Sequence, residues 1–173
     1  MSESEQPRTL TSAIAAISIP SSGPGQGKSE DEARTRIAQL EREARALGQA
    51  PEAALLFHEI GLLWESPLKH PRNAAVAYQS AFKLAPKFLA NIRAARRLFS
   101  EVGNWSMAAQ LLEAELNATE APRARAALLF EKGQVLEQRL SREGDALDFY
   151  AQSLALEPSD VALLCQLEQV FSE

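Results

Sequence analysis

The side chains that could support catalysis are few and far apart along this 173-residue chain. His58 and His70 are its two imidazoles, and neither has a serine or cysteine nucleophile beside it in the sequence. Cys165 is the single thiol, so the chain has no internal disulfide and no cysteine–histidine spacing typical of a metal site. Nothing in these positions predicts a catalytic triad, which depends on close geometry. We therefore predict a chain that is not an enzyme and uses no cofactor or metal.

One short motif resembles the end of a phosphate-binding loop, the Gly-Lys-Ser at positions 27–29. Such a loop also needs a glycine at position 22, where Ser22 stands, and a buried strand directly before it. Pro20 and Pro24 interrupt that approach, and no pattern typical of a strand follows. The sequence therefore predicts no nucleotide site here.

A cluster of arginines offers binding chemistry instead. Arg93 and Arg97 are four residues apart, which places both on one face of a helix, and Arg96 is next to them. Two guanidinium groups on one face can hold a carboxylate or a phosphate through paired hydrogen bonds. The alternative is a solvated face, or pairing of the arginines with Glu113 and Glu115 on a neighbouring helix.

The composition sets the broad class of protein. Hydrophobic residues make up 46% and charged residues 24% of the chain, as is typical of a soluble globular protein. The net charge of −5 argues against a general nucleic-acid binder, which carries a basic face. No apolar run is long enough to span a membrane, and the first residues lack the basic stretch of a secretory signal. We expect a cytoplasmic protein that binds neither nucleic acid nor membranes.

The chain divides by composition into two parts. Residues 1–29 are rich in serine, proline and glycine, which predicts a disordered N-terminal tail, whereas residues 30–173 predict a helical domain. Within the tail, Leu10, Ile14 and Ile17 have helical spacing. This stretch predicts either a short helix that docks on a partner or on the chain's own groove, or a partly helical tail.

Helical spacing predicts two amphipathic helices between residues 51 and 86, joined by a loop that contains Pro67 and Pro71. The apolar stripe of the first helix consists of Phe57, Ile60, Gly61 and Trp64, and that of the second consists of Ala74, Tyr78, Ala81 and Phe82. Small residues in each stripe would let two antiparallel helices approach closely, while the aromatic side chains fill the gaps. A helix at about residues 30–46 would cover this pair as a cap.

Internal repetition extends this pattern along the chain. Four pairs of identical residues are 72 positions apart: Gly61 and Gly133, Ala74 and Ala146, Tyr78 and Tyr150, and Pro86 and Pro158. The spacing resembles the signature of the tetratricopeptide repeat, a helix pair of 34 residues. We identify about three degenerate repeats, near 51–86, 89–120 and 123–158, with flanking helices and a half-repeat at 161–173. The resemblance is weakest in the second repeat, where Arg96 stands at the usual glycine position.

The resemblance implies an all-α fold, a right-handed superhelical array (α-solenoid) of antiparallel helix pairs. It also implies a non-enzymatic scaffold that binds a peptide or helix of another protein in a concave groove. By matching positions, the groove would be lined by His58, Leu62, Glu65, Arg93, Arg97, Ser100, Phe130, Gln134 and Glu137. Arg96 lies beside Arg97 and is a further candidate for partner binding. The arginines would suit an acidic partner. Leu62 and Phe130 do not fit the subclass that clamps a C-terminal carboxylate, so that form of binding is not predicted.

The C-terminal residues 161–173 leave two further possibilities open. They carry apolar side chains on several sides of a predicted helix, and such faces need a partner. We expect the chain to be the N-terminal part of a longer repeat protein. The alternatives are the regulatory region of a larger enzyme and a self-assembly module that associates through this helix.

Overall fold

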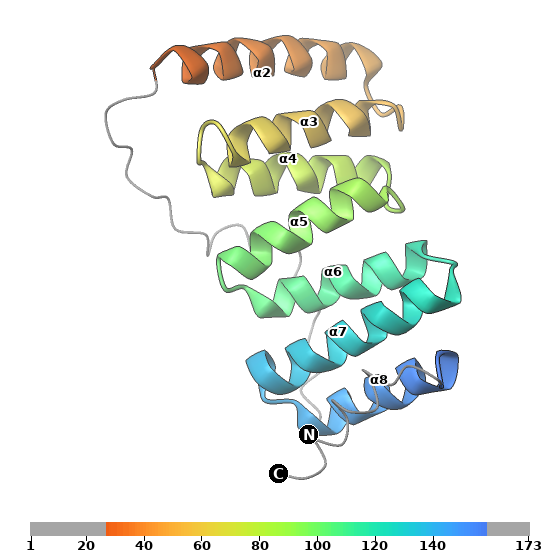
Figure 1. The fold of residues 1–173 in the computed structure, drawn as a ribbon. Helices are drawn as coiled ribbons and strands as arrows, with labels where there is room; N and C mark the ends of the chain where they lie inside the picture. Colours follow the sequence, from red (N-terminus) through yellow and green to blue (C-terminus); the bar gives the residue numbers. More distant parts are fainter. Residues whose placement is uncertain (1–26, 159–173) are drawn as a thin grey trace, which may run out of the picture. The chain divides into compact units, whose positions relative to one another are not determined.

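The computed structural model describes residues 27–158, all of whose regular structure is α-helical (Figure 1). Its helices are α2 (Gly27–Leu47), α3 (Ala53–Glu65), α4 (Pro71–Leu84), α5 (Leu89–Glu101), α6 (Trp105–Ala118), α7 (Pro122–Leu140) and α8 (Glu143–Leu156). Helices α3 and α4 pack closely as an antiparallel pair, as do α7 and α8, and α2 and α5 pack on this first pair. The expected class, an all-α fold of antiparallel helix pairs, is therefore confirmed.

The described residues fall into two compact units, residues 27–107 and residues 108–158. Within residues 27–107 the first unit holds α2 to α5 and the first turn of α6. Within residues 108–158 the second unit holds the rest of α6 with α7 and α8. Helix α2 begins at Gly27, three residues before the expected start of the helical region.

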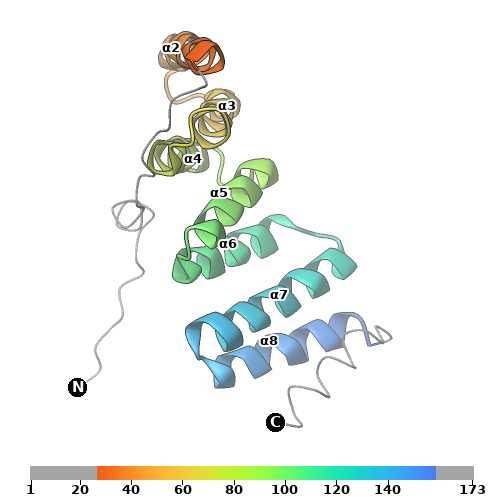
Figure 2. The same cartoon turned by 60° about the vertical axis from the view of Figure 1, so that its left-hand side comes forward.

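The core of the first unit lies between α2, α3 and α4, which Figure 2 shows nearly end-on. Helix α2 contributes Ala33, Ile37 and Leu40, all buried, and these pack with Ile60 of α3. The side chains of α3 that lie around this cluster are only partly buried: Leu56, Phe57, Leu63 and Trp64. The expectation that the first helix caps the following pair is borne out by its packing on α3.

Close approach of α3 and α4 depends on Gly61. A Cβ atom at this position would lie 2.2 Å from Cε1 of Tyr78, so only glycine leaves room for the buried tyrosine ring. The loop between these helices spans residues 66–70. Pro71 was expected in that loop but is the first residue of α4, a position where the missing N–H of proline costs no hydrogen bond.

Residues 102–104 form the turn from α5 to α6. Gly103 has a φ of 74°, in the left-handed region that glycine adopts most easily. Asn104 accepts a hydrogen bond at its Oδ1 from the backbone N–H of Met107, at 3.3 Å. This side chain therefore satisfies one of the unpaired N–H groups at the start of α6.

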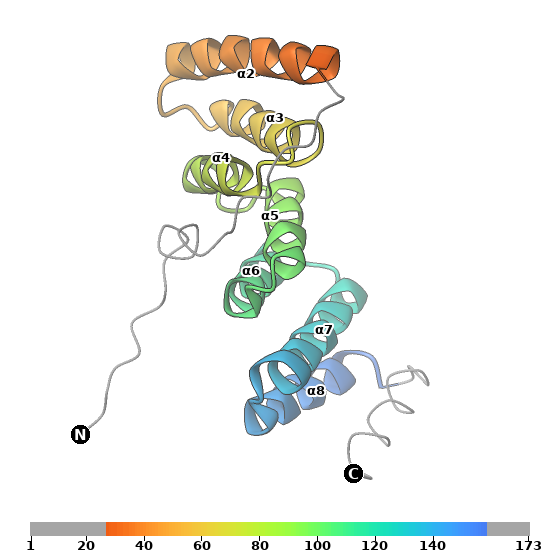
Figure 3. The ribbon, with the colours of Figure 1, turned by 90° about the vertical axis from the view of Figure 1, so that its left-hand side faces the viewer.

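The second unit repeats the α3–α4 packing in α7 and α8, which lie side by side in Figures 1 and 3. A Cβ atom at Gly133 would lie 2.4 Å from Cε1 of Tyr150. The core here is formed by Leu112 and Leu116 of α6 with Leu128 and Leu129 of α7. The 72-residue offset in the sequence thus corresponds to a repeated contact between a glycine and a tyrosine ring.

Several expectations concern residues outside 27–158. The apolar stretch from Leu10 to Ile17, the thiol of Cys165 and the half-repeat at 161–173 all lie outside the described residues. The docking helix in the tail and self-association through the C-terminal helix therefore stay predictions.

Candidate functional site

One face of α3 carries a stripe of two exposed leucines and two half-buried polar residues. Leu55, His58, Leu62 and Glu65 follow one another at helical spacing along this face. Leu55 is 60% exposed and Leu62 is 40% exposed, although both are large apolar residues. Exposed apolar side chains that share one face are typical of a binding surface.

An open pocket lies at the N-terminal end of this stripe. Its volume is about 590 Å³, and it is lined by Pro51, Ala54, Leu55, Ala85, Pro86, Lys87 and Phe88. Most of these side chains are apolar, and Lys87 adds one positive charge. The pocket therefore suits an apolar side chain, with room for an acidic group at its border.

His58 connects the stripe on α3 with the start of α5. Its ring centroid lies 5.1 Å from that of Phe88 in an edge-on arrangement, and 5.8 Å from that of Tyr78. The Nδ1 atom of His58 and the Oδ1 atom of Asn91 are both buried and lack hydrogen-bond partners of acceptable geometry. Asn91 is itself held by a hydrogen bond of 2.9 Å from its Nδ2 to the backbone oxygen of Tyr78.

Burial lowers the pKa of His58 below its ordinary value, and the nearby Asn91 only partly opposes this shift. We expect nuclear magnetic resonance titration to show His58 accepting its proton at a lower pH in the folded chain than in urea. Below the pKa that His58 has in the unfolded chain, the unfolded state binds more protons than the folded state. This histidine therefore makes the free energy of unfolding fall as the pH is lowered. The His58→Gln variant assigns the resonance, and an unshifted or raised pKa would contradict this account.

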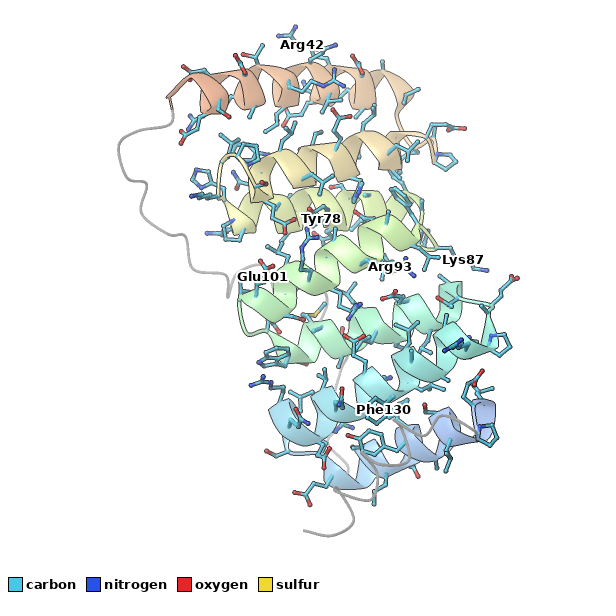
Figure 4. The ribbon with its side chains drawn as sticks, viewed as in Figure 1. Arg42, Tyr78, Lys87, Arg93, Glu101 and Phe130 are labelled. Atoms are coloured by element: carbon cyan, nitrogen blue, oxygen red, sulfur yellow. The ribbon has the colours of Figure 1, made fainter. Side chains whose placement is uncertain are left out.

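A hydrogen-bonded network joins α3, α4 and α5 at the other end of the stripe. Arg97 donates to Oε1 of Glu65 from Nη2 at 2.9 Å and from Nε at 3.2 Å. The hydroxyl of Tyr78 donates to Oε2 of the same carboxylate. Arg97 also lies 3.9 Å from a carboxylate oxygen of Glu101. Figure 4 marks Tyr78 on α4 and Arg93 and Glu101 on α5.

This network changes the interpretation of the arginine cluster. Arg97 is still 55% exposed at its side chain, but Glu65 and Glu101 already offset its charge. Glu113, considered as a partner for the arginines, pairs with Lys132 of α7. Glu65 lies 32 residues before Arg97. The sequence contained one indication of the role of this glutamate, because a glutamate also stands at the matching position of the third repeat.

The structure divides the predicted site residues between the two units. His58 and Leu62 of α3 and Arg93, Arg96 and Arg97 of α5 belong to the first unit, where Arg93 is exposed and Arg96 is half-buried. Gln134 and Glu137 of α7 belong to the second.

Glu137 is the counterpart of Glu65 in the repeat. It accepts a hydrogen bond of 2.6 Å from the hydroxyl of Tyr150, as Glu65 does from Tyr78. Phe130 occupies the position of His58, and its ring centroid lies 5.2 Å from that of Tyr150. Both glutamates therefore have a structural role that the sequence analysis missed when it assigned them to the groove.

Two other kinds of site were sought among the described residues. No group of three or more histidine, cysteine, aspartate or glutamate side chains in residues 27–158 is arranged to hold a metal ion. In the same part of the chain, no helix combines the length and the apolar character required to cross a membrane.

Comparison with known proteins identifies the fold. No family model matches the chain, and no curated protein matches it by sequence. Among solved structures, it is similar to the N-terminal domain of stress-induced protein-1 (STI-1) from C. elegans, with a TM-score of 0.57 and 17% identity. The match covers 69% of this chain and 94% of that domain. Such a likeness shows the fold, a helical repeat of the tetratricopeptide type.

Proposed function

We propose that this chain, which has a tetratricopeptide-type fold, is a non-enzymatic protein-interaction module. It binds a peptide or a helix of a partner protein on the surface formed by α3 and α5 of the first unit. The observation that carries the proposal is the pair of exposed leucines, Leu55 and Leu62, that flank His58 on one face of α3. The similarity to the STI-1 domain supports an interaction module of this general kind.

The chemistry of this surface defines the partner segment. An apolar side chain of the partner enters the pocket beside Leu55 and Phe88, and burial of apolar area supplies most of the affinity. An acidic side chain faces Arg93 and the exposed part of Arg97. Glu65 and Glu101 already offset much of the charge of Arg97. Acidic side chains of the partner segment therefore determine its orientation more than its affinity.

The test uses peptides selected from a random library by their binding to the full chain. Their affinities are then measured for the native chain and for the Leu62→Glu variant, which places a charge between the pocket and Glu65. We expect the dissociation constant to rise at least tenfold, since one buried apolar anchor contributes more than 1 kcal/mol to typical interfaces.

The control is Leu147→Glu in α8, because Leu147 is also 40% exposed. It should leave the dissociation constant within about twofold, which corresponds to less than about 0.5 kcal/mol. Equal losses in both variants, or none in Leu62→Glu, would place binding elsewhere on the chain.

The charge contribution is tested with Arg93→Glu and with Arg42→Glu, which is an exposed residue of α2 and makes the same change in net charge. For acidic peptides we expect Arg93→Glu to weaken binding several-fold at low salt, and the difference between the two variants to shrink at high salt. The same weakening by both variants would indicate a general charge effect without a site.

A further inference from the structure

A second apolar groove lies on the other side of α3, between α2 and α4. It consists of two adjoining hollows of about 360 Å³ and 280 Å³, which share Phe57 and Ser80 in their linings. Phe57, Ile60 and Trp64 of α3 form its floor. Helices α2 and α4 both pack on α3 and run in the same direction on either side of the groove (Figures 1 and 3).

The groove is apolar at its base, and its edge carries the exposed cation Lys83 beside one ion pair. Phe57 and Trp64 remain half-buried, and Val76 on the α4 side is 48% exposed. On the α2 side, Glu41 and Arg45 pair with each other at 3.4 Å. The apolar base favours an amphipathic occupant, and a basic one would meet Lys83 and gain no unpaired counter-charge from Glu41.

We propose that residues 9–19 of this same chain occupy the groove, as a short helix that packs Leu10, Ile14 and Ile17 on Phe57 and Trp64. Residues 9–19 contain no charged residue. Three of their four large aliphatic side chains, Leu10, Ile14 and Ile17, have the spacing of one helix face. This inference concerns the face of α3 opposite to the proposed partner surface and does not depend on it.

The lengths of chain and groove agree. The groove runs along α2 from Glu41 to Gly48, about 11 Å at 1.5 Å per residue, and a helix from Leu10 to Ile17 has the same length. From Gly27 to Glu41 the distance along α2 is about 21 Å. The eight residues from Ile19 to Gly27 span up to about 26–29 Å when extended. The segment therefore reaches the groove when it runs antiparallel to α2.

Tethering makes even weak binding sufficient. A short linker gives its segment an effective concentration in the millimolar range. A free peptide with a dissociation constant below about 1 mM would therefore occupy the groove for most of the time when it is part of the chain.

The first experiment compares two full-length variants that add the same charge to the tail. Leu10→Glu, Ile14→Glu and Ile17→Glu together remove the apolar face, whereas Ser12→Glu, Ala15→Glu and Ala16→Glu together charge the opposite face. We expect the first variant to shift the indole N–H resonance of Trp64 and the amide resonance of Val76. The second should leave both at their native positions. Identical spectra for the two variants would overturn the proposal.

The second experiment adds a peptide of residues 8–20 to the first of these variants. We expect the Trp64 and Val76 resonances to return to their native positions with a dissociation constant below about 1 mM. Val76→Asp should abolish this binding. Val102→Asp, at another exposed valine of the same unit, should not. No binding at 1 mM peptide would overturn the proposal. The proposal would also be overturned if the Trp64 and Val76 resonances of the native chain changed on dilution together with the molecular mass. That result would show that the segment of one copy binds the groove of another copy.

Discussion

Replacing Gly61 with alanine is expected to lower the free energy of unfolding by about 2–3 kcal/mol, the upper range for an overpacked core site. The added methyl group would lie 2.2 Å from the ring of Tyr78. That ring cannot move away easily, because its residue is 1% exposed and its hydroxyl is bonded to Glu65. Urea denaturation followed by circular dichroism measures the loss, and Gly133→Ala should behave similarly against Tyr150.

Two further variants separate this clash from a general effect of alanine. Gly144 of α8 has no atom within 4 Å of an added Cβ, so Gly144→Ala should be neutral or stabilise by up to about 1 kcal/mol. Combining Gly61→Ala with Tyr78→Leu should cost less than the sum of the two single changes, since the smaller side chain leaves room for the methyl group. Additive losses would mean that the glycine and the ring do not constrain each other.

The second large effect is expected in alkaline solution. Burial, followed by the hydrogen bond to a glutamate, raises the pKa of Tyr78 and of Tyr150 well above the ordinary value. Above about pH 10 the unfolded tyrosines lose their protons while the folded ones keep theirs. The unfolded state is therefore stabilised as the pH rises, and the free energy of unfolding falls by at most about 2.7 kcal/mol per pH unit for the two groups.

The measurement is simple because these are the only two tyrosines in the chain. Tyrosinate absorbance should appear near pH 10 in urea and only at a clearly higher pH in the folded chain. Lysines also titrate in this range, so the Tyr78→Phe, Tyr150→Phe double variant provides the control. Its stability should fall less steeply with pH than that of the native chain. Equal slopes would show that the folded tyrosines ionise normally.

The helices and their pairing could be predicted from the sequence because both depend on local patterns. Small residues in the predicted stripes were expected to let two helices approach while aromatic side chains fill the gaps, and Gly61 and Tyr78 of α3 and α4 meet in this way. The 72-residue offset identified the second copy of this contact at Gly133 and Tyr150. The helix boundaries were predicted less well. Gly27 and Pro71 were expected outside helices but are the first residues of α2 and α4, because the ends of a helix depend on local end effects more than on composition.

The ion-pair partners of the site could not be predicted in the same way. Arg97 and Glu65 are 32 residues apart, and the repeat period matches positions of α3 with positions of α5 without indicating which side chains meet. Only the packing of α3, α4 and α5 brings the guanidinium, the carboxylate and the Tyr78 hydroxyl together. The same packing buries His58 against Phe88, which determines the direction of its pKa shift.

The sequence by itself determined which residues form helices, which faces those helices bury and where the helix pair is repeated. These properties depend on the period of an α-helix and on side-chain size, which act over a few residues. The tertiary structure alone decided that Arg97 is paired with Glu65, that Leu55 stays exposed, and that an apolar groove lies between α2 and α4. Each of these depends on how far apart two non-consecutive helices lie, and that distance is set by the packing of all the side chains between them.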